Sequence, residues 1–178
     1  GEFASESAQP LLEYAMWADT VLLPGNLGRN SQTSIAVETL LRSYTGQVIL
    51  ACDSIEALSG SAPMLLQRPQ TSLIVSFAQL QTLTRHARLP AAPTYGMGLV
   101  KLVELLHILT TTNVTANLMT LHQNQIVVAH NGLVSTTKVA PETTKSWRVA
   151  ASTYAACFQT WNPDKPFEAL THSASLLR

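Results

Sequence analysis

The residues best suited to chemistry follow two apolar segments of the chain. Asn26, Gly28 and Arg29 come after the apolar run 21–23, and Asp53 comes after a second apolar run at 47–52. A glycine-bearing turn that leads into a helix presents backbone N–H groups, which bind phosphate and other anions. A carboxylate after the next strand can orient a ribose hydroxyl or a magnesium-bound water. The pattern predicts a ligand site at the ends of two neighbouring strands.

Each of these residues also has a simpler explanation. The glycine can serve an ordinary strand-to-helix turn by supplying a positive φ. Asp53 can cap the short helical turn that begins near Ile55. Both interpretations stay open from the sequence.

The elements that must position these residues alternate between strand and helix. A short helix from Pro10 leads into the first strand. The helix after the glycine turn is expected to be capped by Asn30 or Ser31 and to have an inner face that includes Ile35. After the second strand, a Gly/Ser/Pro connector at 59–63 is expected to form a loop, and a short apolar patch at 64–66 follows it. The remaining expected elements are a strand at 71–75, a helix at 77–88 capped by Ser76, a helix at about 99–111, strands at 117–121, 126–130 and 133–137, and helices at 146–158 and 166–176.

This order predicts one α/β domain with a mostly parallel sheet covered on both faces. Antiparallel strands are expected at its carboxyl-terminal edge, because Asn131-Gly132 is a strong hairpin signal.

Composition narrows the classes of partner. Only 12% of the 178 residues are charged and the net charge is zero, which argues against nucleic acid as a partner. The low charge favours a homo-oligomer, in which another subunit covers part of the surface. No apolar stretch is long enough to span a membrane, and no export signal is visible, so we expect a cytoplasmic protein.

The cysteines and histidines do not predict a metal site. The two cysteines, Cys52 and Cys157, lack the spacing of a disulfide framework or a metal site. Cys157 lies in an apolar helix and is expected to be an inert, buried thiol. The five histidines are not spaced for metal binding, and no structural metal is expected.

Several segments together resemble a known family. The run Leu23-Pro24-Gly25-Asn26-Leu27-Gly28-Arg29 resembles the "GPGLGR" segment of the ADP-dependent NAD(P)H-hydrate dehydratases, which belong to the ribokinase-like superfamily. Asp53-Ser54-Ile55-Glu56-Ala57-Leu58 is similar to the family's "DADALN" segment. The order of the later segments also fits, so that the resemblance covers nearly the whole chain.

The resemblance implies a three-layer αβα sandwich of ribokinase-like type, with a longer amino-terminal part than this chain has. It also implies ADP or ATP as the cofactor and adds Asn131, Ser146 and Arg148 to the candidate nucleotide-binding residues. From its position near a helix start, Arg148 is either a phosphate contact or a solvated surface side chain.

The chain departs from the family where the chemistry should be. The family's "GSGD" corresponds to Lys145-Ser146-Trp147-Arg148, so that an arginine replaces the carboxylate and cannot act as a general base. Its "HPGE" corresponds to Ser76-Phe77-Ala78-Gln79, which lacks the imidazole, the glycine and the acid. We therefore expect no catalytic residues and at most nucleotide binding. The alternative is a non-catalytic structural or regulatory protein that binds a partner or oligomerises.

Overall fold

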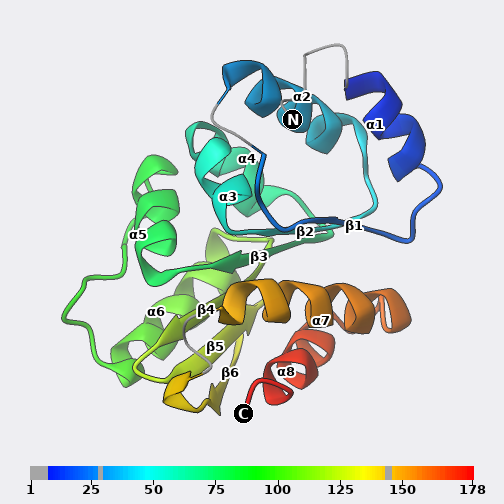
Figure 1. The fold of residues 1–178 in the computed structure, drawn as a ribbon. Helices are drawn as coiled ribbons and strands as arrows, with labels where there is room; N and C mark the ends of the chain where they lie inside the picture. Colours follow the sequence, from blue (N-terminus) through cyan, green and yellow to red (C-terminus); the bar gives the residue numbers. More distant parts are fainter. Residues whose placement is uncertain (1–7, 28–29, 143–145) are drawn as a thin grey trace.

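A six-stranded sheet in the order β1-β2-β3-β4-β5-β6 forms the centre of the protein (Figure 1). The computed structural model describes residues 8–27, 30–142 and 146–178. The strands are β1 (Thr20–Leu23), β2 (Gln47–Ala51), β3 (Thr71–Val75), β4 (Asn117–His122), β5 (Gln125–His130) and β6 (Leu133–Lys138). The helices are α1 (Ala8–Ala15), α2 (Ser31–Ser43), α3 (Asp53–Ala57), the 3-10 turn η2 (Ser59–Ser61), α4 (Ala62–Gln67), α5 (Phe77–His86), α6 (Leu99–Thr112), α7 (Trp147–Trp161) and α8 (Pro166–Ser175).

Strands β1 to β4 are parallel, and β4, β5 and β6 pair antiparallel. The hairpin between β5 and β6 turns at Asn131 and Gly132, whose φ angles of 46° and 77° are those of a type I′ turn. The predicted α/β fold with a mostly parallel sheet and a carboxyl-terminal antiparallel edge is therefore confirmed.

Helices cover both faces of the sheet. Val48, Leu50 and Leu73 belong to a core that includes residues of α2, α4, α5 and α6, whereas Ile49 and Ile74 belong to a second core with α7 and α8. Figure 1 shows α7 and α8 together on one side of the sheet. Because β2 and β3 are buried on both faces, their sequences are continuous apolar runs without alternation.

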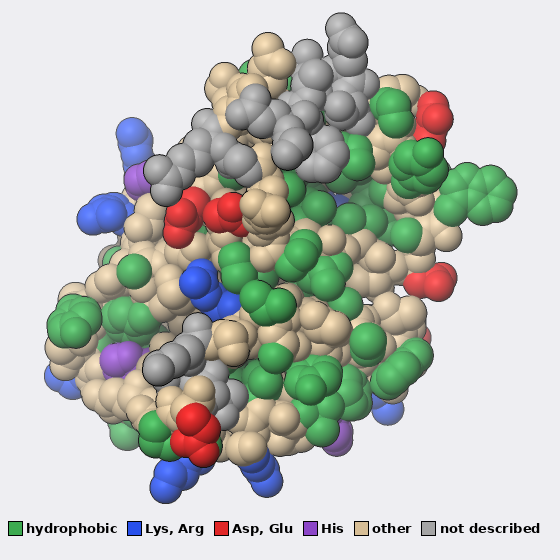
Figure 2. Space-filling view, viewed as in Figure 1, with side chains coloured by type: hydrophobic (Ala, Val, Ile, Leu, Met, Phe, Trp, Pro, Cys, Tyr) green, Lys and Arg blue, Asp and Glu red, His purple; other side chains and the backbone are tan. Residues whose placement is uncertain are grey.

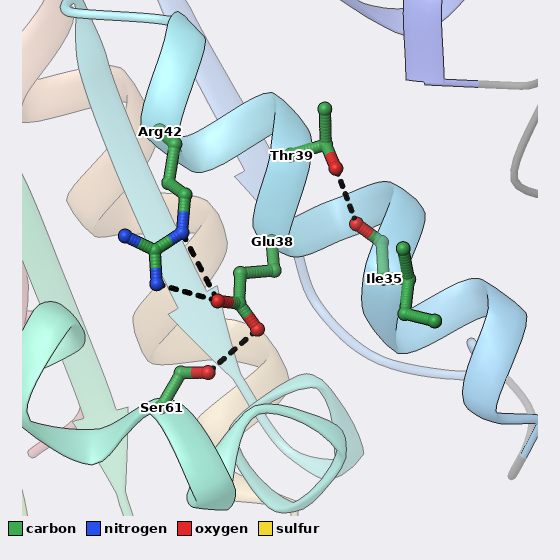
Figure 3. A network of polar contacts seen from close by, with 5 residues as sticks. All are labelled: Ile35, Glu38, Thr39, Arg42 and Ser61. Atoms are coloured by element: carbon green, nitrogen blue, oxygen red, sulfur yellow. Dashed lines mark hydrogen bonds and ion pairs between the residues drawn. The ribbon is translucent and has the colours of Figure 1, made fainter.

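Helix α2 is tied to the connection that follows α3 (Figure 3). The Glu38 carboxylate accepts hydrogen bonds from Arg42 Nη2 at 2.6 Å and from Ser61 Oγ at 2.6 Å. The bond from Ser61, followed by the bond and charge of Arg42, holds the pKa of Glu38 below its ordinary value. The contact holds the segment after β2 against the helix that follows β1.

Three local expectations were wrong. Ile35 is exposed, because the inner face of α2 follows 33, 36, 37, 40 and 41, and Ile35 lies off that stripe. Cys157 is exposed for the same reason, since the buried positions of α7 include 151, 155 and 159. The connector expected to be a loop forms η2 and α4, with Pro63 in the first turn of α4, where its missing N–H costs nothing.

None of the helices in the described ranges has the length and apolar character needed to cross a bilayer.

Candidate functional site

At the carboxyl ends of β1 and β2, a hydrogen bond joins the turn after β1 to the segment that follows β2, the two segments in which the sequence predicted a ligand site. The backbone N–H of Asn26 donates to Asp53 Oδ1 at 2.5 Å. Asp53 is the first residue of α3, and Cys52 occupies the N-cap position. The Asp53 carboxylate therefore holds the turn after β1, a role that differs from the expected capping of its own helix.

The turn after β1 depends on an unusual backbone. Gly25 has φ of +125° and Asn26 has φ of +60°. A Cβ on Gly25 would collide with Asp53 Oδ1 and would approach the Cβ of Cys52 to 3.0 Å. The close approach of the two loops therefore requires glycine at position 25.

Gln79, in the first turn of α5, joins three elements at this edge. Its Nε2 donates to the Cys52 carbonyl at 2.8 Å and to Glu56 Oε1 at 3.1 Å. Its Oε1 accepts from the backbone N–H of Ser76 at 2.9 Å and from Arg148 Nη1 at 3.0 Å. The buried Gln79 amide thus links α3, α5 and α7 through four hydrogen bonds.

Cys52 has a backbone conformation that is rare for a residue with a side chain. Its φ of 54° and ψ of −131° lie where residues other than glycine are strained. The bond from Gln79 to its carbonyl helps to hold this geometry. Burial raises the pKa of the Cys52 thiol, and nearby Arg148 opposes that shift only in part, so that the thiol stays protonated at neutral pH and is a poor nucleophile.

The start of α7 reaches the same edge of the sheet. Ser146 is its N-cap residue but makes no side-chain capping bond, and the first turn carries no acidic side chain. Among the described residues, no carboxylate oxygen lies within 4 Å of the Arg148 guanidinium, which bonds to the neutral Gln79 amide. Figure 2 shows acidic and basic side chains close together on this face, over α3 and the beginning of α7.

A hollow of about 260 Å³ lies beside these residues and is lined by Glu56, Ser59, Ser76 and Gln79, among others. Within the described ranges, no group of three histidine, cysteine, aspartate or glutamate side chains is placed to hold a metal ion.

The structure brings together Asn26, Asp53 and Arg148, with Ser146 at the start of α7, but it does not bring Asn131 to them. Because β5 runs antiparallel to β4, the hairpin that holds Asn131 lies at the amino ends of the parallel strands, beside α6. Asp53 and Asn26 lie at the carboxyl ends of these strands. Placing Asn131 with the other site residues was therefore wrong. Gly28 and Arg29, as well as Lys145, lie outside the described residues.

Sequence reasoning missed the central position of Gln79 and the participation of Cys52 and Glu56. A signal was present, because Ser76 and Gln79 are spaced as a capping box, and the structure contains both of its bonds. The bonds from Gln79 to α3 and α7 had no such signal.

Comparison with known proteins identifies the fold and leaves the activity open. No protein-family model matches the sequence, and no curated protein matches it. A ribokinase-like superfamily protein from Enterococcus faecalis V583 is similar in structure, with a TM-score of 0.73 and 14% identity over 98% of this chain and 58% of that one. A hypothetical protein from Streptococcus mutans has a TM-score of 0.69 and 14% identity, over 98% of this chain and 60% of that one.

This chain thus spans about three fifths of the length of those two proteins. The structural similarity to them extends over nearly all of the residues of this chain. The chain therefore has a ribokinase-like α/β fold.

Proposed function

We propose that this protein binds a phosphate-bearing ligand, with ADP or ATP as the first candidates, at the carboxyl edge of its parallel strands. We further propose that it does not dehydrate hydrated NAD(P)H. The proposal rests on Arg148 and the beginning of α7, and it uses the resemblance of the chain to the NAD(P)H-hydrate dehydratases.

Arg148 is the observation that carries the proposal. A cation in the first turn of a helix is disfavoured by the helix dipole, typically by about 0.3–1 kcal/mol. Here the first turn of the 15-residue α7 holds no acidic side chain, and the guanidinium bonds to a neutral amide. A phosphate group would offset the charge of the guanidinium and the positive end of the helix dipole, by accepting bonds from the guanidinium and from backbone N–H groups at the start of α7.

The same residues argue against dehydratase chemistry. Arg148 occupies the position of the family's carboxylate and cannot take up a proton. Gln79 occupies the position of the family's acid, and both ends of its amide are already hydrogen-bonded. The carboxylate of Asp53 is held by Asn26. Binding without turnover is the function that this arrangement supports best.

Calorimetric titration with ADP, ATP and NADPH tests the binding. We expect Arg148→Ala to weaken the affinity at least tenfold, which corresponds to about 1.4 kcal/mol. The matched control is Arg85→Ala, since Arg85 is an exposed arginine in the last turn of α5. Failure of the unsubstituted protein to bind at millimolar ligand, or equal binding by the Arg148 variant, would contradict the proposal, as would turnover of hydrated NADPH.

One observation favours the alternative of a partner-binding protein. Within the described part of the chain, β1 pairs with one strand, β2, and all four of its residues are only partly buried. Trp17 and Met16, just before β1, are 93% and 70% exposed. An open, uncharged edge strand of this kind is suited to pairing with another strand. Light scattering of the purified protein, compared with Val21→Lys, would reveal an assembly formed through this edge.

A further inference from the structure

Four buried polar side chains lie at the amino ends of the parallel strands, beneath α7. Gln47, Ser72 and Asn117 come from the adjacent strands β2, β3 and β4, and Gln159 comes from α7. None is more than 8% exposed. The three strand residues are two positions before Ile49, Ile74 and Met119, all of which belong to the core under α7 and α8, so that their side chains point to the same face.

These side chains form a continuous chain of hydrogen bonds. Gln159 Oε1 accepts from Gln47 Nε2 at 2.8 Å and from Ser72 Oγ at 2.9 Å. Ser72 Oγ in turn accepts from Asn117 Nδ2 at 2.8 Å.

Two polar atoms of these hydrogen-bonded side chains remain unpaired within the described part of the protein. Gln159 Nε2, a donor, and Asn117 Oδ1, an acceptor, are buried without a hydrogen-bond partner among the described residues. Both amides are bound to the same Ser72 hydroxyl, so that a single hydroxyl group separates the two amide groups that carry these atoms. Buried polar atoms are rarely left unpaired in folded proteins, because each loses its bonds to solvent on folding.

Turning the side-chain amides over does not give every donor and acceptor a partner. If the amides of Gln47, Gln159 and Asn117 were all turned over, Gln159 Nε2 could donate to Gln47 and Ser72, and Ser72 could donate to Asn117. The atoms left over would then be Gln159 Oε1 and Asn117 Nδ2. Either orientation leaves one donor and one acceptor.

His130 supplies a third such atom. It lies one residue beyond the Leu118–Ala129 pair of β4 and β5, so that it faces Asn117 across the two strands. Its Nδ1 is also buried without a partner among the described residues.

We propose that an ordered water molecule is bound inside the protein here, joining Gln159 on α7 to Asn117 on β4, with His130 as its third partner. A ligand at this place must both donate and accept a hydrogen bond. A metal ion cannot accept from Gln159 Nε2, and an anion without a proton, such as chloride, cannot donate to Asn117 Oδ1. Water meets both demands, and about three bonds are usual for a buried water.

The water site is separate from the proposed ligand site. Gln159 follows Arg148 by eleven residues on α7, which corresponds to roughly 16 Å along the helix. Its chain of hydrogen bonds holds α7 to three strands at their amino ends. Arg148 meets Gln79 at the carboxyl ends of the parallel strands. The water thus completes the attachment of α7 to the sheet.

Water-selective NOE and ROE spectra of the unsubstituted protein provide the direct test. We expect cross-peaks of opposite sign in the two experiments between water and the side-chain amide protons of Asn117 and Gln159, the signature of a long-lived internal water. They should persist in Ser72→Ala, where the serine hydroxyl cannot relay the signal. Absence of these cross-peaks in the unsubstituted protein would overturn the proposal.

Oxygen-17 relaxation dispersion, which counts long-lived waters, gives a second test. We expect Asn117→Leu to lose the equivalent of one water molecule. Ser173→Ala is the control, because the buried Ser173 hydroxyl is already bonded to the Leu170 carbonyl at 2.7 Å. An unchanged dispersion in a folded Asn117→Leu would contradict the proposal, and if that variant does not fold, the NOE experiment decides.

Discussion

The Asp53 carboxylate occupies the space that a side chain on Gly25 would need. A Cβ at position 25 would collide with Asp53 Oδ1, while the same oxygen accepts the backbone N–H of the next residue, Asn26, at 2.5 Å. The loops after β1 and β2 are thus packed against each other through one glycine and one carboxylate. This contact shapes the edge at which we place the ligand.

Replacing Gly25 by alanine should therefore destabilise the protein. The φ of +125° is strained for alanine, and Asp53 must also move. We expect a loss of about 2–3 kcal/mol in the free energy of unfolding, measured by urea denaturation. Gly60→Ala is the control, because no atom lies within 4 Å of a Cβ there, and it should have an effect within about 0.5 kcal/mol. Equal effects of the two substitutions would refute this account of Gly25.

Gln79→Glu should weaken anion binding. A carboxylate at this position would pair with Arg148 and compete with the ligand for the guanidinium. It would also lose the bond to the Cys52 carbonyl and repel Glu56. We expect the dissociation constant for ADP to rise about tenfold or more in calorimetric titration.

Gln81→Glu is the matched control for this substitution, since Gln81 lies on the same helix and bonds to the Pro93 carbonyl instead. Unchanged ADP affinity in Gln79→Glu would remove Arg148 from the binding site.

Arg68 should be essential for stability, although the sequence did not single it out. Arg68 is only 9% exposed, and its guanidinium donates to the carbonyls of Leu41, Tyr44 and Gly46 and to Thr71 Oγ1. Burial lowers the pKa of Arg68, an effect that Tyr44 opposes only in part, and the carbonyls stabilise the charge. Arg68→Met should cost about 3–5 kcal/mol in urea denaturation, because several buried carbonyls lose their donor.

The control is Arg42→Met, because Arg42 is exposed and pairs with Glu38 at the surface. This substitution should lower the free energy of unfolding by about 1 kcal/mol or less. A similar cost for both arginines would show that the buried bonds of Arg68 contribute little.

The contribution of Glu38 should disappear in acid. Its folded-state pKa is lowered by Ser61 and Arg42 (Figure 3), so that the stabilisation is fully present above the ordinary pKa of 4.5 and is lost as the pH falls through the lower folded value. Glu38→Gln should therefore be less stable than the unsubstituted protein at pH 7, with the difference shrinking below pH 4.5. Urea denaturation at several pH values measures this. A difference that stays constant or grows in acid would contradict it.

The sequence by itself determined most of the elements and their type, with the exception of η2 and α4, whose residues 59–63 were expected to form a loop. The continuous apolar runs at 47–51 and 71–75 predicted buried parallel strands, and the Asn131-Gly132 pair predicted the hairpin. Ser76 was predicted as a helix cap, and of the two candidates Asn30 and Ser31 the structure has Asn30 as the cap of α2. These features depend on the backbone preferences and apolar periodicity of residues close together in the chain, and such preferences can be read directly from the sequence.

Only the tertiary structure decided which polar side chains meet. Gln79 and Arg148 are 69 residues apart in the chain, and Gln47 and Gln159 are 112 residues apart. Their contacts depend on strand order and on the rotation of α7 about its axis, which no local pattern specifies. Asn131 illustrates the same point, because the reversal of direction between β4 and β5 carries it to the edge opposite Asp53.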